Sequence, residues 1–600
     1  MKKASFLSLG VTSLLIGFVP GLSFAFPHDA NGYNQFPLPA LKIYVSSSTG
    51  SNSNDGFSEA RPVATIAKAR DQMRNYATAG TSYAVLLKAG DQFTGGFIQW
   101  CHSGKSAAEP SIIGKYGTSA QRPIVNVQEE AAVDLSCSSV SNLVIADIQF
   151  RTPSNDNRGS TGIRAVSGGS NLYIENITLG DADDPTRGFK DGIILGPGVW
   201  TNVSIRYSAI LDSYAPTGYG HSQGIFADGS KGLLVEGCVF DHNGWNPKVA
   251  GAEPTIFNHN FYINGANEGF VARNNIITNA SSHGVSSNAN GITYDNGSMI
   301  KNNYFGQNAF NIFMRTGYSQ AIDNVIEDVK DISPGLLRGI GISVGTVETE
   351  HPPINPGPAL VQNNLIRGRI ALGQQNAIEV KGNIPAYHSR VDVVGNVVYH
   401  WNTYNMVEVL PQATTTDVIR FIGNSFQALA GFMGSYAILG ANALFQSNIY
   451  STYSPNPFRV NGGGSKLTFN QWKGGYEPGA VQANRVFPDS TRSVGKYSAS
   501  LGGAPNLAGF LREARKISRD NFRRQYTADA LNNYMRTGFG MSTSDFDPLD
   551  FNKDGFVNGE DFDLFTNRFI QGDMTADFDR DGFVSGEDFD AFASAFSSKI

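Results

Sequence analysis

The sequence predicts a mainly β protein, a parallel β-helix solenoid that is followed by a small α-helical domain. Three observations lead to this prediction. A short phrase built around Asn recurs between Leu143 and Tyr450. The segments that close each phrase are short, β-branched and alternating, as β-strands are. From residue 541 onward the composition becomes acidic, and one loop occurs twice, each copy followed by a helical pattern.

Residues 1–25 have the pattern of a secretory signal peptide. Lys2 and Lys3 precede an apolar run, Phe6 to Val19, and a cleavage site with small residues follows at 23–25. The run is too short to span a bilayer, and no later segment approaches the roughly 20 apolar residues of a membrane helix. We therefore expect a secreted protein, extracellular or at the cell surface, without a membrane span.

The mature chain opens with a strand, a helix and a second strand. Residues 43–46 and 85–88 are apolar and β-branched, and a Gly- and Asn-rich turn follows the first of them. Pro62 then begins an amphipathic segment that continues to about Ala79. The first turn of a solenoid exposes an unpaired edge, so we expect this region to be an N-terminal cap.

The central repeat consists of an apolar residue, two variable positions, Asn, one variable position, and an apolar or aromatic residue. Successive copies lie 21 to 40 residues apart. The Asn position is held by Asn275, Asn303, Asn324, Asn364, Asn396, Asn424 and Asn448. Four earlier copies have other residues there, namely Ile148, Ile177, Ser208 and Cys238.

This repeat predicts stacking, because so short a strand unit cannot bury its apolar face alone. A buried Asn at a bend can hydrogen-bond its counterpart in the next turn, so we expect the Asn positions to be structural. A β-propeller is the alternative architecture. It would show blades of about 40 to 50 residues with aromatic signatures, which this sequence lacks.

Residues 41–460 resemble the right-handed parallel β-helix proteins of the pectate-lyase-like superfamily, through the opening segment and the Asn repeat. The resemblance implies a right-handed solenoid with an N-terminal cap. It leaves the reaction open, because that superfamily contains lyases, hydrolases, esterases, epimerases and non-catalytic adhesins or tailspikes.

The chain after the last repeat divides into two parts before the acidic region. Residues 461–537 contain a Gly- and Pro-bearing stretch and an amphipathic helical pattern at 504–536, which we expect to cap the lower end of the solenoid. Residues 538–546 have the composition of a linker.

Two acidic loops, 27 residues apart, have the ligand spacing of a calcium loop. Each offers side-chain oxygens at positions 1, 3, 5, 9 and 12, a carbonyl at position 7, and Gly at position 6 for the sharp turn. The predicted ligands are Asp550, Asn552, Asp554, Phe556, Asn558 and Asp561, then Asp577, Asp579, Asp581, Phe583, Ser585 and Asp588. We therefore expect two calcium ions within residues 547–600.

Both loops end in Asp at position 12, where an EF-hand sensor usually carries a bidentate Glu, and each leads into one short helix, at 562–569 and 589–596. This pattern resembles the dockerin module, a pair of calcium loop-helix units. The resemblance implies a tether to a cohesin-like partner protein. Gly-Glu pairs at 559–560 and 586–587 replace the Ser-Thr that dockerins commonly use to read the partner, which leaves that partner open.

Charge and cysteine content exclude some classes of protein. Residues 541–600 hold 14 acidic and 4 basic side chains, whereas the preceding 540 residues carry a net charge of +4 with scattered Lys and Arg, so we expect no nucleic-acid partner. Three cysteines cannot form a disulfide framework for a chain of this length. For Cys101 and Cys137 we expect buried free thiols rather than a bridge.

Four of the nine histidines lie within 63 residues, in the middle of the predicted solenoid. Solenoids bind long ligands along a lateral groove, with functional residues on the loops and strand ends of the middle turns. The candidate catalytic residues are His221, Asp241, His242, His259, Tyr262 and His283. We expect a polysaccharide as the ligand.

Two reactions fit these residue types. Elimination from a uronic acid needs a base, a cation for the carboxylate and an acid for the leaving oxygen, which His, Tyr, Lys and Arg supply. Glycoside hydrolysis needs two opposed carboxylates, for which Asp191, Asp212, Asp228 and Asp241 are available. A non-catalytic carbohydrate-binding or adhesion protein and a histidine metal site remain alternatives, although the histidines lack the close spacing of many zinc sites.

Overall fold

The structure is a computed structural model. It describes residues 26–597 except 30, 78–79, 218–219, 266, 289–296, 316, 331, 333–338, 346–356, 369–375, 382–387, 402–404, 410–417, 429–431, 437–442, 453, 461–463, 542–548, 550, 552–558, 577 and 579–582.

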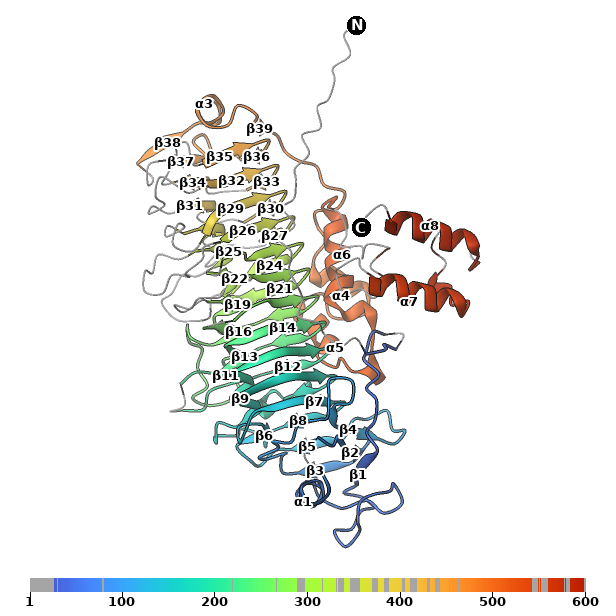
Figure 1. The fold of residues 1–600 in the computed structure, drawn as a ribbon. Coiled ribbons are helices and arrows are strands. Elements are labelled where there is room, and N and C mark those ends of the chain that lie inside the picture. Colours follow the sequence, from blue (N-terminus) through green and yellow to red (C-terminus); the bar gives the residue numbers. More distant parts are fainter. Residues whose placement is uncertain are drawn as a thin grey trace.

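The body is a parallel β-helix, as the repeat predicts, in which each turn of chain adds strands to three parallel ladders (Figure 1). Ladders 1 and 2 belong to one 25-stranded sheet, because two long strands, β9 (Thr161–Glu175) and β11 (Asp191–Arg206), run through both of them. Ladder 3 is a separate 14-stranded sheet.

The strands of each ladder follow one another along the rod. Beside β9 and β11, ladder 1 contains β6 (Ala131–Asp134), β13 (Gln223–Asp228), β16 (His259–Asn264), β19 (His283–Ser287), β22 (Phe310–Met314), β25 (Ile340–Val344), β28 (Asn376–Val380), β31 (Asn405–Val409), β34 (Phe432–Tyr436) and β37 (Phe458–Val460). Ladder 2 contains β1 (Leu41–Val45), β2 (Tyr83–Lys88), β4 (Ser111–Tyr116), β7 (Val140–Ala146), β14 (Ser230–Glu236), β17 (Phe270–Arg273), β20 (Ser298–Lys301), β23 (Gln320–Ile322), β26 (Gly357–Gln362), β29 (His388–Val394), β32 (Val418–Ile422) and β35 (Ala443–Gln446). Ladder 3 contains β3 (Gln92–Thr94), β5 (Ile124–Asn126), β8 (Gln149–Arg151), β10 (Thr178–Leu179), β12 (Ala209–Leu211), β15 (Val239–Asp241), β18 (Ile276–Thr278), β21 (Tyr304–Asn308), β24 (Val325–Val329), β27 (Leu365–Arg367), β30 (Val397–Tyr399), β33 (Ser425–Gln427), β36 (Ile449–Ser451) and β39 (Val481–Gln482).

The recurring Asn residues form one buried column at the start of ladder 3. Nδ2 of Asn303 donates to Oδ1 of Asn324 at 3.1 Å, and the same contact recurs from Asn324 to Asn364 at 3.0 Å and from Asn364 to Asn396 at 2.9 Å. Glu477 ends the column, since its carboxylate accepts from Asn448, Tyr450 and Trp472. The structural role predicted for this repeat is confirmed.

The residue before each Asn of the column lies in a left-handed turn and is Asn, Gly, Asp or Ser. This position has a φ of 57° at Asn274, 52° at Asn302 and 55° at Asn363, and 64° at both Gly395 and Gly423. Few side chains tolerate the left-handed region, and Asn and Gly are the usual residues there. The Asn-Asn and Gly-Asn pairs of the sequence therefore mark the corner between ladders 2 and 3.

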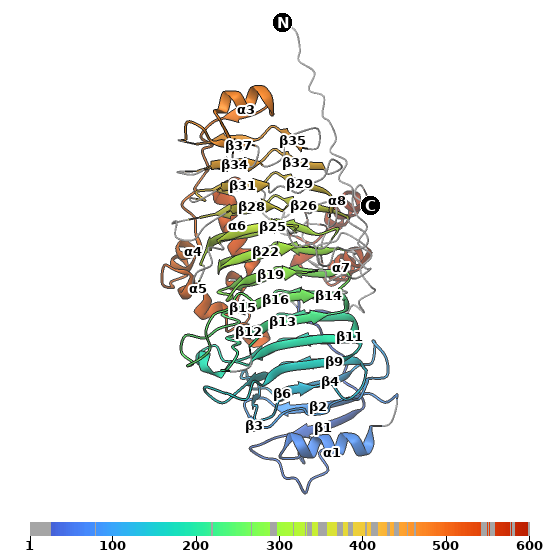
Figure 2. The same cartoon turned by 90° about the vertical axis from the view of Figure 1, so that its left-hand side faces the viewer.

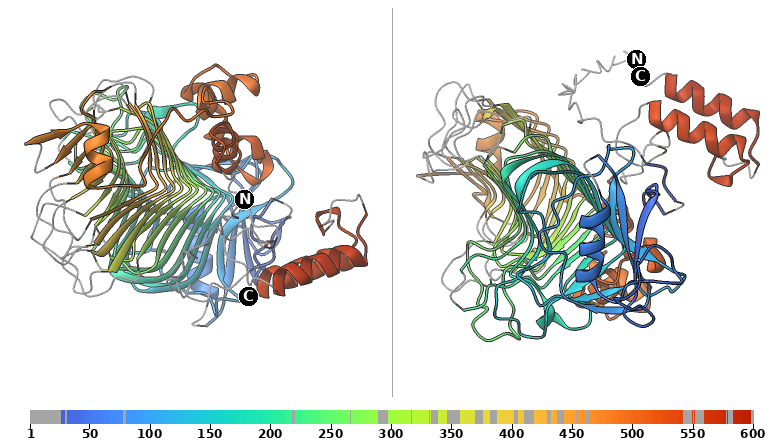
Figure 3. Two further views of the ribbon diagram at one scale, coloured as in Figure 1. Left: turned by 90° about the horizontal axis from the view of Figure 1, so that it is seen from above. Right: turned by 60° about the horizontal axis from the view of Figure 1, so that its bottom comes forward.

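Helices cover both ends of the stack (Figure 3). At the first end, α1 (Ile66–Tyr76) begins after the N-cap Thr65 and buries Ile66, Ala69 and Met73 against the first turns, as the sequence predicts. At the last end, β38 (Ser465–Leu467) pairs antiparallel with β37 and leads into α3 (Phe469–Gly475). Trp472 of α3 is fully buried in the core of the rod.

The helical segment predicted to cap the lower end lies elsewhere, and that prediction was wrong. Helices α4 (Val494–Ser500), α5 (Leu507–Ala514) and α6 (Ala528–Gly538) run along the side of the rod, against ladder 3 (Figures 1 and 3). Their buried apolar residues form one cluster with Ile276, Tyr304, Val325, Leu365 and Val397 of ladder 3. The outer face of ladder 3 is itself apolar, so it needs a cover.

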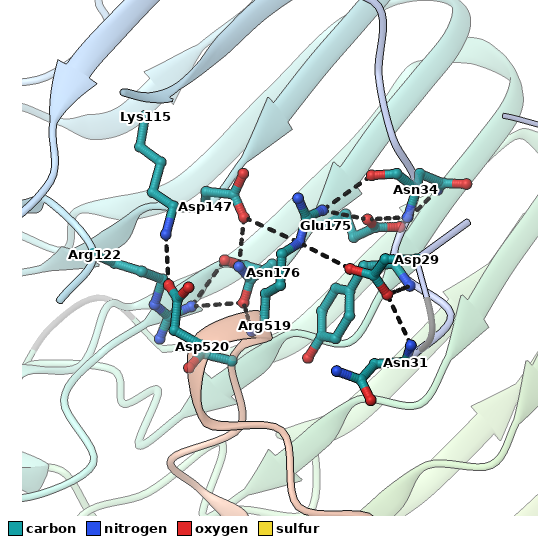
Figure 4. Close-up of polar contacts among 12 residues, drawn as sticks. Asp29, Asn31, Asn34, Lys115, Arg122, Asp147, Glu175, Asn176, Arg519 and Asp520 are labelled. Carbon is teal, nitrogen blue, oxygen red and sulfur yellow. Dashed lines mark hydrogen bonds and ion pairs between the residues drawn. The ribbon is translucent and has the colours of Figure 1, made fainter. Parts of the chain in front are cut away.

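Charged side chains fix these helices and the N-terminal segment around Asp29 and Asn34 to the rod. Arg519 lies 3.4 Å from the buried Glu175 and 3.7 Å from Asp29 (Figure 4). Glu175 also accepts from the backbone and side-chain N–H groups of Asn34, at 2.7 and 2.6 Å. The N-terminal and C-terminal segments of the body therefore meet at one turn.

The cysteines correct a second prediction. Cys101 and Cys137 form a disulfide, although the sequence favoured buried free thiols. The windings bring these positions, 36 residues apart, to a Cα–Cα distance of 5.9 Å, which the sequence alone does not reveal. Cys238 is a buried free thiol in the Asn column, where its N–H donates to Asn275 at 2.9 Å.

The C-terminal domain contains the two predicted helices, α7 (Gly559–Ile570) and α8 (Gly586–Ser597). They pack around Phe565 and Phe592, whose rings stack with their centroids 3.9 Å apart and which are fully buried. In the part of the chain that the structure describes, no helix is long and apolar enough to cross a membrane.

Candidate functional site

Ladder 1, whose strands β13, β16 and β19 can be followed in Figure 2, carries three of the predicted catalytic residues on its outer face. His259 begins β16 and His283 begins β19, the next strand of the ladder, so the two imidazoles lie on consecutive turns. Tyr262 follows on β16, and its ring contacts that of His259 at a centroid distance of 5.1 Å.

Hydrogen bonds define the tautomers of this histidine pair. Nδ1 of His259 accepts from the backbone N–H of His283 at 3.2 Å and lies 3.0 Å from Nδ1 of His283. An acceptor nitrogen in neutral His259 places its proton on Nε2, and the close contact then requires the proton of His283 on Nδ1. The lone pair of His283 therefore lies on Nε2, the nitrogen that could act as a base.

Aromatic rings extend along the same face. Phe226, Tyr262 and Phe313 occupy matching outward positions on β13, β16 and β22, with a centroid distance of 5.6 Å between Phe226 and Tyr262. His283 contacts the ring of Phe313 at 5.5 Å. Rings in this arrangement offer flat apolar surfaces beside polar groups, which sugar rings can stack on.

His221 lies beside this group, near the start of β13. It is exposed, and its ring contacts Phe257, which is 57% exposed, at a centroid distance of 5.5 Å. Gln223, two residues further along, pairs in register with His259. The structure therefore brings His221, His259, Tyr262 and His283 to one side of the rod.

Asp241 and His242 lie at another place, at the end of β15 in ladder 3. Asp241 is buried and accepts from Arg515 and from Thr278 and Asn279, both at 2.8 Å. Burial is the largest influence on the pKa of Asp241 and raises it, but Arg515, His242 and the hydrogen bonds from Asn279 and Thr278 together hold the pKa below its usual value. These contacts give Asp241 a structural role in seating α5 on the rod.

His242 follows Asp241 in the left-handed region, with a φ of 62°. Its ring stacks on Trp245 at a centroid distance of 4.3 Å, and burial lowers the pKa of this imidazole. The neighbouring Asn243 donates to Asn260 of β16 at 2.8 Å. His242 therefore lies at the bend that connects ladder 3 with ladder 1, next to the strand that carries His259.

Sequence reasoning missed a second polar group on the outer face of ladder 1, near its far end. Asn376 and Glu379 of β28 pair in register with Asn405 and Glu408 of β31. A signal for them is present, because both strands carry the pattern Asn-x-x-Glu-Val with a spacing of 29 residues. A search for clustered histidines passes over that repeat.

Most of the predicted calcium ligands lie outside the described residues, namely Asp550, Asn552, Asp554, Phe556, Asn558, Asp577, Asp579 and Asp581. Of the others, Asp561 and Asp588, both at loop position 12, are fully buried at the starts of α7 and α8. Asp588 accepts from the N–H groups of Phe578 and Ser585, at 2.6 and 2.8 Å. Phe583 is 72% exposed.

The histidines themselves form no metal site within the described residues, where no group of three or more His, Cys, Asp or Glu side chains has a suitable arrangement. The pair His259 and His283 is hydrogen-bonded through Nδ1, which uses the nitrogens that a shared ion would need.

Comparisons with known proteins concern the fold. No protein-family model matches the chain, and no curated protein matches it. Among solved structures, a GH136 lacto-N-biosidase from Eubacterium ramulus matches with a TM-score of 0.35 and 13% identity, over 74% of this chain and 68% of that one. Pectate lyase Pel9A matches with a TM-score of 0.33 and 15% identity, over 69% and 80%. A tailspike protein of E. coli bacteriophage HK620 matches with a TM-score of 0.40 and 12% identity, over 75% and 79%.

Proposed function

We propose that this protein is a secreted enzyme that cleaves glycosidic bonds of a polysaccharide along the outer face of ladder 1. The proposal rests on the strand register of that face, which sets three kinds of side chain along one ladder. They are the rings of Phe226, Tyr262 and Phe313, the pair His259 and His283, and the carboxylates Glu379 and Glu408. Successive turns are about 4.8 Å apart, so the face offers a linear array to a linear polymer.

Two features of the face support cleavage over simple binding. His283 offers Nε2 as a base, and its partner His259 contacts the ring of Tyr262, which suits proton abstraction in an elimination. Glu379 and Glu408 present paired carboxylates, which suit hydrolysis. An adhesion surface needs neither arrangement.

We also propose that the C-terminal domain binds two calcium ions and tethers the enzyme to a cohesin-like partner. Asp561 and Asp588, which occupy the matching position 12 of two oxygen-rich loops at the starts of α7 and α8, support this, because carboxylates at that spacing suit calcium. The predicted signal peptide at residues 1–25, which lies outside the described residues, supports secretion.

Incubation of the full chain with pectic, alginate-like and sulphated polysaccharides tests the enzymatic proposal. We expect either new reducing ends or unsaturated products that absorb in the ultraviolet, and a loss of kcat/KM of tenfold or more in His259→Ala and His283→Ala. His102→Ala, in the N-terminal region, is the matched control. Binding without any product would favour the non-catalytic carbohydrate-binding protein, and unaltered kinetics in both variants would remove the histidine pair from the site.

A further inference from the structure

The repeated pattern Asn-x-x-Glu-Val places two carboxylates side by side. Ile378 of β28 and Val407 of β31 are fully buried in the core of the rod, so the neighbouring Glu379 and Glu408 point to the outer face. Strand pairing sets Glu379 directly beside Glu408. Neighbouring strands lie about 4.8 Å apart, and the two side chains leave the ladder in parallel.

Amide groups join the two carboxylates. Nδ2 of Asn376 donates to Oε2 of Glu408 at 2.6 Å and lies 3.3 Å from Oε1 of Glu379. One amide nitrogen therefore contacts both carboxylates and holds them close together. Nδ2 of Asn405 lies 3.4 Å from Oε1 of Glu408 and donates to Oδ1 of Asn376 at 3.2 Å.

One atom of this group lacks a partner within the described structure. Asn405 is only 1% exposed, yet its Oδ1 accepts no hydrogen bond there. A buried carbonyl oxygen without a hydrogen-bond donor lowers the stability of the fold by about 1 to 3 kcal/mol, so such atoms are rare. A sugar hydroxyl bound beside Glu408 would supply the missing donor.

The two carboxylates have different surroundings. Lys381 lies 3.2 Å from Oε2 of Glu379, so a cation contacts that carboxylate. Burial raises the pKa of Glu408, and the negative charge of Glu379 adds to this, although Asn376 acts in the opposite direction. Such a difference between two neighbouring carboxylates separates the roles of nucleophile and acid.

Two buried carboxylates elsewhere in this rod pair with arginine, whereas the buried Glu477, which ends the Asn column, accepts from an amide, a hydroxyl and an indole N–H. Glu236 lies 2.8 Å from both Arg206 and Arg273, and Glu327 lies 2.8 Å from Arg367. Glu379 and Glu408 contact amides and one lysine instead, and share one amide nitrogen.

We propose that Glu379 and Glu408 are the nucleophile and the acid–base residue of a retaining glycoside hydrolase, and that the histidines and rings of the earlier turns bind the polymer. This inference rests on the proposed function and specifies its reaction. The spacing of about 4.8 Å between neighbouring strands fits the roughly 5 to 5.5 Å separation of retaining enzymes better than the wider one of inverting enzymes.

The reaction has two steps. A carboxylate oxygen of Glu379 forms a bond to the anomeric carbon while the bond from that carbon to the leaving oxygen breaks, and Glu408 gives its proton to the leaving oxygen. Water then attacks the same carbon, its proton returns to Glu408, and the bond to Glu379 breaks. The products are two shorter chains, one with a new reducing end of unchanged anomeric configuration.

The ladder defines where the rest of the polymer lies. β16, which carries His259 and Tyr262, is four turns from β28, or about 19 Å along the rod. A chain of several sugar units covers that length. The face therefore fits an extended polysaccharide, with cleavage near Glu379 and further binding positions towards Tyr262.

The test compares Glu379→Gln and Glu408→Gln with the wild type on the polysaccharide panel. Glu268→Gln, which removes an equal charge from a residue paired with Lys231 at 3.3 Å, is the matched control. We expect reducing ends without ultraviolet absorbance, a fall in kcat of at least 1,000-fold in both variants, unchanged polysaccharide binding in affinity electrophoresis, and wild-type activity in the control. Proton NMR of the fresh product should show retention.

Other outcomes separate the two proposals. Turnover that survives in both variants, inversion of configuration, or unsaturated products would overturn the role of the carboxylate pair and leave polysaccharide cleavage standing. Absence of any product from the wild type would overturn both. A variant that loses binding together with activity is checked by circular dichroism, and a folded variant of that kind assigns the pair to binding and overturns its catalytic role.

Discussion

Replacing Asn364 by Ala in the middle of the buried column should destabilise the rod strongly. Oδ1 of Asn364 accepts from the backbone N–H and the side-chain amide of Asn324, both at 3.0 Å, and its Nδ2 donates to Ala321 O at 2.8 Å and to Asn396 at 2.9 Å. Truncation leaves two buried donors and one carbonyl without this partner. At about 1 to 3 kcal/mol for each of these three groups, the free energy of unfolding should fall by about 3 to 9 kcal/mol.

The measurement combines urea unfolding of the full chain with hydrogen exchange, because a repeat rod can open locally without unfolding throughout. Peptides that cover β24 and β27 should lose protection first in Asn364→Ala. Asn521→Ala is the control: this residue is exposed and its side chain makes one contact, to Lys516 O at 3.2 Å, so we expect a change within about 0.5 kcal/mol. A loss below about 1 kcal/mol for Asn364→Ala, with protection unchanged, would refute the assignment of the column as a stabilising element.

Three further predictions concern charge and metal. Arg515→Met leaves Asp212 and Asp241 buried without their cation, so α5 should detach, with a loss of about 3 to 5 kcal/mol and rapid proteolysis of residues 494–538. Burial raises the pKa of Glu236, but Arg273 and Arg206 together outweigh burial and hold this pKa at about 2. The ionised Glu236 therefore stabilises the fold above pH 4.5, and about 3 kcal/mol of the free energy of unfolding should be lost as pH falls towards 2. Acid titrations followed by circular dichroism measure this loss. Chelation of calcium should disorder residues 547–600 and leave the rod folded, and an unchanged spectrum of the full chain with unchanged exchange in α7 and α8 would contradict this.

The pH dependence of activity follows from the acid role of Glu408. A raised pKa keeps this group protonated to higher pH than an ordinary Glu, and activity should fall as pH rises through that pKa, because the proton for the leaving oxygen is lost. Glu408→Gln should lose this alkaline limb of the profile. If the limb persists in the residual activity of the variant, another group titrates.

The sequence predicts the rod well because its signal is repeated. The same Asn position recurs in successive turns of the rod. A different residue at one such position, as with Cys238, does not hide the period of the repeat. The lateral helices were misplaced although a signal existed: Ile276-Ile277, Val325-Ile326 and Leu365-Ile366 put apolar residues on both faces of ladder 3. A strand that is apolar on both faces needs a cover on each.

The proposed site overlaps in part with the residues predicted from the sequence, for a different physical reason. His259, Tyr262 and His283 were found because they are close in the sequence and their turns stack directly. Asp241 was included with them, but the chain turns a corner after β15, and that residue faces Arg515 instead. Glu379 and Glu408 were missed because their proximity comes only from the register of β28 and β31, which depends on the lengths of every intervening turn.

The three outer faces of the rod differ in what covers them, and this difference supports the placement of the site. Ladder 3 is covered by α4, α5 and α6 through an apolar cluster. The first turns of ladder 2 carry Phe26 and Phe36 of the N-terminal segment over Leu86 and Tyr173, and further along Asp392 pairs with Arg390 and Arg420. Ladder 1 instead presents imidazoles, rings and amide-linked carboxylates. Of these groups, His259 and Glu379 are buried, whereas Tyr262, His283 and Glu408 are partly exposed, which leaves them accessible to a bound polymer.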